Sequence, residues 1–166
     1  MLNQFHKRAW SVKLIIKSSG LANYLNGKSA VSEKTLKKYL EKYFGNEHID
    51  PLFELAPLAS AKSVPNDSGL YALYDSSKKL LYFGKASRLK VEMNQTLNRA
   101  APKQLWALAS NKATYRQPKF KEMVTYFSVY KVTPDSSELR HHLESFVLRV
   151  VLNSTMNQRT GKLKVR

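Results

Sequence analysis

Apolar and polar positions alternate most clearly between residues 69 and 86. Two short stretches rich in aromatic and aliphatic residues, 69–74 and 80–86, flank a polar run of Asp, Ser and Lys at 75–79. Strand-favouring runs separated by turn-forming residues are typical of two antiparallel strands joined by a tight turn. The pattern therefore predicts a β-hairpin over this part of the chain.

The register of this hairpin decides where its tyrosines lie. If the loop contains the four residues that follow Asp75, then Asp75 pairs with Leu80 and Tyr71 pairs with Gly84. Tyr71 and Tyr82 are then diagonal neighbours on one face, and the small Gly84 leaves room beside Tyr71. A loop one residue shorter or longer would place the two tyrosines on opposite faces. The expected tyrosine pair therefore depends on the turn.

Two helices have recognisable start signals. Ser32 is the predicted N-cap of a helix over residues 33–44, which has apolar residues at helical spacing and ends at Gly45. The lysines on its polar side form either a solvated surface or a nucleic-acid-binding face. Asp135 is the predicted N-cap of the last helix, with Glu138 three residues later as in a capping box.

The remaining elements follow from the spacing of apolar residues. Helical spacing is present at 89–97 and, after Asp135, as far as residue 151, and a shorter helix is expected at 103–111. Residues 112–121 form a basic segment that contains a proline and is expected to be a loop. The segment 123–133 is rich in β-branched and aromatic residues and predicts a third strand.

These elements predict an α+β fold with a small antiparallel three-stranded central sheet flanked by helices. Residues 1–62 differ in residue pattern from the rest of the chain and are interpreted as an N-terminal helical region. Several prolines lie between the two parts, and residues 63–166 are expected to form the main domain.

Charge is the strongest signal in the composition. The chain has 166 residues, 28 Lys and Arg against 12 Asp and Glu, and a formal net charge of +16. Such an excess favours a polyanionic partner, most often nucleic acid, although an anionic membrane surface or a basic structural role would also fit. Cysteine is absent, which excludes disulfides and thiolate metal sites. The absence of a membrane-length apolar run or a signal peptide predicts a cytoplasmic protein with no membrane partner.

The hairpin also contains a family signature. Gly69-Leu70-Tyr71, then ten residues, then Tyr82-Phe83-Gly84 resembles the motif of the GIY-YIG nucleases, and Lys85-Ala86 is similar to its continuation in the excision-repair branch. The order of hairpin, helix, strand and helix over residues 64–160 is similar to the family's fold. The resemblance implies a metal-dependent endonuclease that hydrolyses phosphodiester bonds, in DNA in preference to RNA.

Glu144 is the candidate metal ligand. It lies next to the apolar stripe of the last predicted helix, where an unpaired carboxylate would cost several kcal/mol. It could pair with Arg140, four residues earlier on the helix, or bind a cation. In the resembled family a glutamate on the helix after the third strand holds the divalent ion. The resemblance therefore implies that Glu144 binds Mg²⁺ or Mn²⁺.

The resemblance also implies roles for the two tyrosines. Tyr71 would act as general base toward water, directly or through a second water, and Tyr82 would orient the nucleophile. A free tyrosine has a pKa of about 10, so we expect Lys85 to lower the pKa of Tyr71. The family often has an asparagine beyond the glutamate helix. Asn157 matches that distance better than Asn153, which could instead be a helix C-cap.

The position of the catalytic arginine departs from the family pattern. The usual position is occupied by Glu92, which cannot bind a phosphate. Arg99 lies seven residues further, on nearly the same face if the helix continues, and we expect it to take the role, with Arg88 as the reserve candidate. If neither reaches the site, the alternative is a catalytically inactive nucleic-acid-binding protein on the same scaffold.

Further basic residues are expected to bind phosphates along the nucleic acid. The C-terminal segment adds four positive charges and no negative one, so it serves either as a solvated tail or as a phosphate-binding segment. The predicted nucleic-acid-binding residues are Arg88, Lys90, Arg116, Lys119, Arg159 and Lys162.

Overall fold

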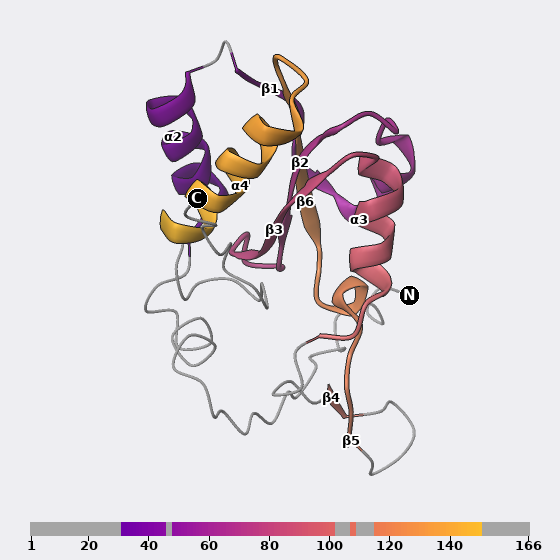
Figure 1. The fold of residues 1–166 in the computed structure, drawn as a ribbon. Coiled ribbons are helices and arrows are strands. Elements are labelled where there is room, and N and C mark those ends of the chain that lie inside the picture. The colour runs from indigo at the N-terminus through magenta and orange to yellow at the C-terminus, as the bar shows by residue number, and fades with distance from the viewer. Residues whose placement is uncertain (1–30, 46–47, 102–106, 109–114, 151–166) are drawn as a thin grey trace, which may run out of the picture.

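The structure is a computed structural model that describes residues 31–45, 48–101, 107–108 and 115–150. Its elements, in chain order, are α2 (Glu33–Phe44), β1 (Ile49–Pro57), the 3-10 helix η1 (Leu58–Ser63), β2 (Gly69–Tyr74), β3 (Leu80–Ala86), α3 (Leu89–Asn98), β4 (Ala107–Leu108), β5 (Tyr115–Arg116), the 3-10 helix η2 (Phe120–Glu122), β6 (Tyr126–Val132) and α4 (Ser137–Val150) (Figure 1).

The central sheet is antiparallel and has four strands in the order β1-β6-β2-β3. The α+β class is confirmed, but the prediction of three strands is wrong because β1 pairs with β6 along the edge of the sheet. The boundary near residue 62 falls between β1 and β2 of this one sheet. Within the described residues it therefore does not separate a helical region from the sheet.

The two faces of the sheet are covered by different helices (Figure 1). Helices α2 and α4 pack on one face, over a core that includes Tyr74, Phe83 and Tyr130. Helix α3 packs on the other face, over a core that includes Tyr71 and Phe127. None of the helices in the described parts of the chain is long and apolar enough to cross a membrane.

The predicted hairpin register is confirmed in its central part. Tyr71 pairs with Gly84 and Leu73 pairs with Tyr82, so both tyrosines face the α3 side of the sheet. The register near the motif residues is therefore the one that brings the tyrosines together.

The tip of the hairpin differs from the prediction. Leu80 pairs with Tyr74 instead of Asp75, after a register shift. The cause is the side chain of Asp75, whose Oδ1 accepts hydrogen bonds from the backbone N–H groups of Ser77 and Lys79 at 2.8 and 2.9 Å. These bonds make Asp75 part of the turn, because Asp side chains readily bond to backbone groups a few residues further on.

One predicted helix cap is confirmed and the other is wrong. The Oγ of Ser32 accepts the backbone N–H of Thr35 at the start of α2. At the start of α4 the cap is Ser136, whose Oγ accepts the N–H of Leu139 at 3.3 Å. The predicted cap, Asp135, instead accepts hydrogen bonds from the side chains of Ser68 and Arg140.

The segment between α3 and β6 also differs from the prediction. Of the helix expected at 103–111, the structure describes residues 107 and 108, which form strand β4 and pair with β5. The basic segment 112–121 contributes β5 and the start of η2 instead of a plain loop. Where the structure describes this segment, it consists of short strands and a 3-10 turn.

Candidate active site

Two tyrosines from adjacent strands form the centre of the site. The ring centroids of Tyr71 and Tyr82 lie 5.7 Å apart with an interplanar angle of 30°. A side chain at Gly84 would not fit, because its Cβ would lie 2.8 Å from a ring carbon of Tyr82 and 3.2 Å from the Tyr71 hydroxyl. Glycine at this position therefore allows the two rings to stack.

The hydroxyl of Tyr71 is held by helix α3. It lies 2.8 Å from Oγ1 of Thr96, and both side chains are buried. Burial raises the pKa of Tyr71 well above its ordinary value, and the nearby Tyr82 raises it further. The hydrogen bond with Thr96 lowers the pKa by less, so the phenol stays neutral near neutral pH. The expectation that Lys85 gives Tyr71 a lowered pKa is therefore wrong in direction.

Arg99 lies against the second tyrosine. It is the C-cap residue of α3, and its Cζ is 5.2 Å from the ring centroid of Tyr82 and 5.3 Å from that of Phe120. The residue is exposed, and its guanidinium forms no hydrogen bond or ion pair with other residues that the structure describes. Its N–H donors are consequently available to an anion.

Glu92 has a structural role at the position where the resembled family has arginine. Its Oε1 accepts the backbone N–H groups of Ser87 and Arg88, at 2.7 and 3.0 Å. These two groups precede the first turn of α3 and would otherwise lack partners at the helix start. The carboxylate therefore stabilises the helix that carries Thr96 and Arg99.

Glu144 faces the edge strand β3. Its carboxylate is half-buried, and Oε1 accepts the backbone N–H of Lys85 at 3.3 Å. The alternative partner, Arg140, instead pairs with Asp135, which precedes α4. Burial raises the pKa of Glu144. The hydrogen bond from the Lys85 N–H and the positive charge of Lys85 partly offset this increase, and the charge of Glu92 raises the pKa further.

Glu144 supplies carboxylate oxygens, the type of ligand that a magnesium-type ion prefers. Among the described residues, no three or more His, Cys, Asp or Glu side chains gather to hold a metal. Mg²⁺ does not require such a group, because it keeps several waters and commonly uses one or two carboxylates together with substrate phosphates. A single half-buried carboxylate with one oxygen outside the Lys85 hydrogen bond is compatible with that mode of binding.

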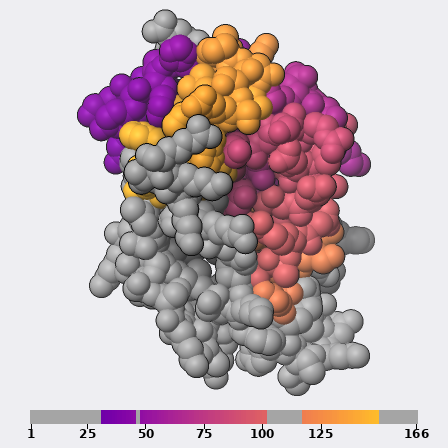
Figure 2. All heavy atoms as spheres, viewed as in Figure 1, coloured from indigo at the N-terminus to yellow at the C-terminus, as the bar shows by residue number. Residues whose placement is uncertain are grey.

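Glu144 reaches β3, the strand that carries Tyr82, from the opposite face of the sheet, because α4 covers the face away from the tyrosine pair. Lys85, which bonds to Glu144, directly follows Gly84, which pairs with Tyr71. In addition, the charge of Glu92 raises the pKa of both Tyr71 and Glu144, so both groups lie within its electrostatic range. The space-filling view shows part of the hairpin exposed between α4 and α3 (Figure 2).

The other predicted residues are only partly described. Arg88, Lys90 and Lys119 are exposed, and Lys119 lies beside the end of α3 through a bridge with Ala100. For Arg116 the structure describes only its backbone position in β5. The predicted site residues Asn157, Arg159 and Lys162, and the alternative Asn153, lie outside the described residues.

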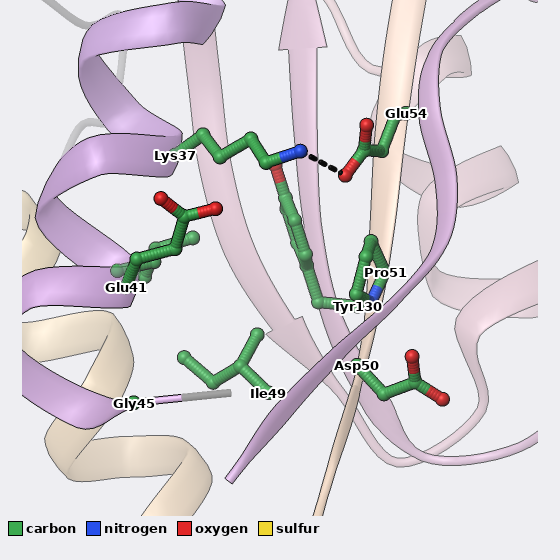
Figure 3. A pocket seen from close by; sticks show the side chains of 9 residues that line it. Lys37, Glu41, Gly45, Ile49, Asp50, Pro51, Glu54 and Tyr130 are labelled. Carbon is green, nitrogen blue, oxygen red and sulfur yellow. Dashed lines mark hydrogen bonds and ion pairs between the residues drawn. The ribbon is translucent and has the colours of Figure 1, made fainter. Parts of the chain in front are cut away.

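A separate pocket lies on the opposite face of the sheet, between α2 and β1 (Figure 3). It has a volume of about 320 Å³, and its lining includes Leu40, Ile49 and the buried Tyr130. Nζ of Lys37 and Oε1 of Glu54 form an ion pair of 2.7 Å beside it. Because its lining belongs to the α2 and α4 core, it is not part of the tyrosine site.

Two residues of the site were not predicted as functional. Thr96 lies within the helical repeat expected at 89–97, and a polar residue at a buried position of such a repeat indicates a buried hydrogen-bond partner. Phe120 lies in the basic segment, where no local pattern indicates that its ring meets Arg99.

Comparison with family models, with curated proteins and with solved structures finds no match for this chain. The resemblance to GIY-YIG nucleases consequently rests on the sequence motif.

The burial of Tyr71 predicts how stability changes at alkaline pH. Unfolded tyrosines ionise at about pH 10, whereas folded Tyr71 stays neutral, so above that pH the unfolded state binds fewer protons and the folded state loses stability. One such tyrosine contributes a slope of about −1.4 kcal/mol per pH unit in the free energy of unfolding. Urea unfolding at a series of pH values should show, above about pH 10, a decline that is shallower for Tyr71→Phe by up to roughly this slope. Equal slopes would mean that Tyr71 ionises normally in the folded protein.

Proposed function

We propose that the protein is a metal-dependent endonuclease of the GIY-YIG type that hydrolyses phosphodiester bonds, in DNA in preference to RNA. The observation that carries the proposal is the stacked pair Tyr71 and Tyr82, with the guanidinium of Arg99 against the outer ring. The motif spacing alone does not specify this arrangement. It arises from the hairpin register together with the end of α3.

The side chains supply the groups that phosphodiester hydrolysis requires. The N–H donors of Arg99 can bind the non-bridging oxygens of a phosphate, and their charge offsets the charge that develops on it. Tyr82 is half-buried, so its hydroxyl can orient a water for attack. Glu144 would hold Mg²⁺ or Mn²⁺, and the ion when bound acts as a Lewis acid on the phosphate.

The raised pKa of Tyr71 limits its part in the chemistry. A neutral phenol donates or accepts a hydrogen bond but does not remove a proton from water by itself. Tyr71 therefore orients water or relays a proton through the pair with Tyr82. A role as base requires additional positive charge beside it, of the kind that bound substrate and cation bring.

The charge of the chain favours a nucleic-acid substrate. With a net charge of +16, binding should be dominated by contacts with phosphates and should weaken as salt displaces them. Arg88, Lys90 and Lys119 are exposed on or next to α3 and extend the positive surface beyond Arg99.

A second candidate function is a nucleic-acid-binding protein that does not cut. Two observations favour it: Glu92 occupies the position of the family's arginine as a helix cap, and Tyr71 is a buried neutral phenol. Both candidates predict binding to nucleic acid, and only the endonuclease predicts strand breaks that depend on metal.

Plasmid nicking distinguishes the two. The wild-type protein should nick supercoiled DNA with Mg²⁺ or Mn²⁺ and not with EDTA. Glu144→Gln should reduce nicking to the EDTA level, because the amide keeps the shape and loses the charge that binds the ion. Glu138→Gln is the matched control, since it changes an exposed carboxylate on the same helix. Equal nicking by both variants would remove Glu144 from the site, and no nicking by wild type would favour the binding protein.

Arginine substitutions test the phosphate-binding group. Arg99→Ala should lower the single-turnover cleavage rate by about 10²–10³-fold, as expected when a donor to a developing charge is lost. Arg88→Ala removes an exposed arginine at the other end of α3 and should change only the affinity, by a few fold. If the two substitutions affect the rate equally, the assignment of the role to Arg99 is wrong.

A further inference from the structure

The end of α3 is attached to the segment that contains η2. The backbone N–H of Phe120 donates to the carbonyl of Arg99 at 3.0 Å, and that of Ala101 donates to the carbonyl of Pro118 at 2.7 Å. The side chain of Lys121 also donates to Oδ1 of Asn98, at 3.0 Å. These bonds lie on both sides of Arg99 along the chain. The backbone of Arg99 is consequently fixed although its side chain is exposed.

Two aromatic rings then meet the guanidinium. The rings of Phe120 and Tyr82 have centroids 5.7 Å apart and are inclined by 76° to each other. The Cζ of Arg99 is nearly equidistant from them, at 5.2 Å from Tyr82 and 5.3 Å from Phe120. A cation at this distance is attracted by the ring quadrupole. The contact involves the rings and leaves the N–H donors of Arg99 available for hydrogen bonds.

This contact compensates for the position of Arg99, which lies further along the chain than the arginine of the resembled family. An exposed arginine without such contacts has many rotamers. A phosphate that binds it must then select the productive rotamer, which costs conformational entropy. Phe120 is buried, so its ring provides a fixed surface, and Tyr82 is itself fixed by its stacking on Tyr71. The guanidinium is therefore held beside the tyrosine pair before any phosphate arrives.

We propose that Phe120 is a positioning residue, whose ring holds the guanidinium of Arg99 against Tyr82 and so places the phosphate-binding group at the tyrosine pair. The proposal deepens the proposed nuclease function and rests on it for its catalytic consequence. The placement of Arg99, however, can be tested without activity.

The spectroscopic test uses the Nε–Hε signal of Arg99 in the full chain. Ring currents from Phe120 and Tyr82 should shift this signal in the wild type away from that of exposed Arg88. Phe120→Leu should move it toward the Arg88 position. Phe127→Leu is the matched control, because Phe127 is fully buried in the same core and packs on Phe53 instead of Arg99. An Arg99 signal that responds equally to both substitutions would overturn the proposal.

A second variant tests the same contact from the arginine side, and it applies even if Phe120→Leu does not fold. Arg99→Ala alters an exposed side chain, so the fold should persist. Its ring-proton signals for Phe120 and Tyr82 should differ from those of the wild type. Unchanged ring signals would show that the guanidinium does not contact these rings in solution, and the proposal would fail.

The kinetic test is a double-mutant cycle at saturating DNA with Mg²⁺. Phe120→Leu should lower the single-turnover rate by roughly 10–100-fold, because a small displacement of a catalytic group has an effect of this size. In an Arg99→Ala background the same change should have an effect of under about threefold, since its target is already absent. Equal effects in both backgrounds, or an equal effect of Phe127→Leu, would indicate general loss of structure and contradict the proposal.

The spectroscopic and kinetic experiments distinguish a failure of the Arg99 placement from a failure of the proposed nuclease function. If wild-type protein does not cleave DNA under any metal condition, the nuclease function fails. The Arg99 signal then decides the placement by itself: a shift that depends on Phe120 supports it, and no such shift overturns it.

Discussion

The site depends on the pairing of Tyr71 with Gly84 across β2 and β3. A slip of one residue would turn one tyrosine to the opposite face of the sheet, because side chains alternate along a strand. The pairing also puts a glycine, Gly84, beside the two rings, where a Cβ would come within 2.8 Å of Tyr82. The stacking of the tyrosines, the ring against which Arg99 lies and the approach of Glu144 to Lys85 all follow from this register.

Burial on the α3 face determines the chemistry that the pair can perform. The same packing that fixes Tyr71 buries its side chain, and the hydrogen bond to Thr96 does not offset the effect of that burial on the pKa. Arg99 has the opposite environment: its backbone is fixed and its charge is exposed. The site thus combines a rigid neutral phenol with a cation whose donors are free. That combination suits the orientation of a phosphate and a water better than direct removal of a proton by the resting protein.

Local patterns predicted the parts of the structure that depend on neighbouring residues. The hairpin, the central register, the apolar repeat of α3 and the Ser32 cap follow from strand alternation, helical spacing and side-chain reach within a few residues. Strand β1 was missed because its prolines and register shifts break the alternation, and it pairs with β6 far along the chain. The Asp135 cap failed because partners from other segments compete for its carboxylate. The contact of Phe120 with Arg99 and the pKa of Tyr71 likewise depend on packing between distant segments.

We propose that phosphodiester hydrolysis takes place at the tyrosine pair. The most direct test is single-turnover cleavage of a labelled duplex by Tyr71→Phe, measured together with binding affinity and unfolding stability, with Tyr43→Phe as a control at an exposed position. Tyr71→Phe should lower the rate by at least about 10²-fold while affinity changes little, because only the hydroxyl that orients water or relays the proton is removed. Cleavage by Tyr71→Phe at the wild-type rate would show that hydrolysis does not depend on the tyrosine pair.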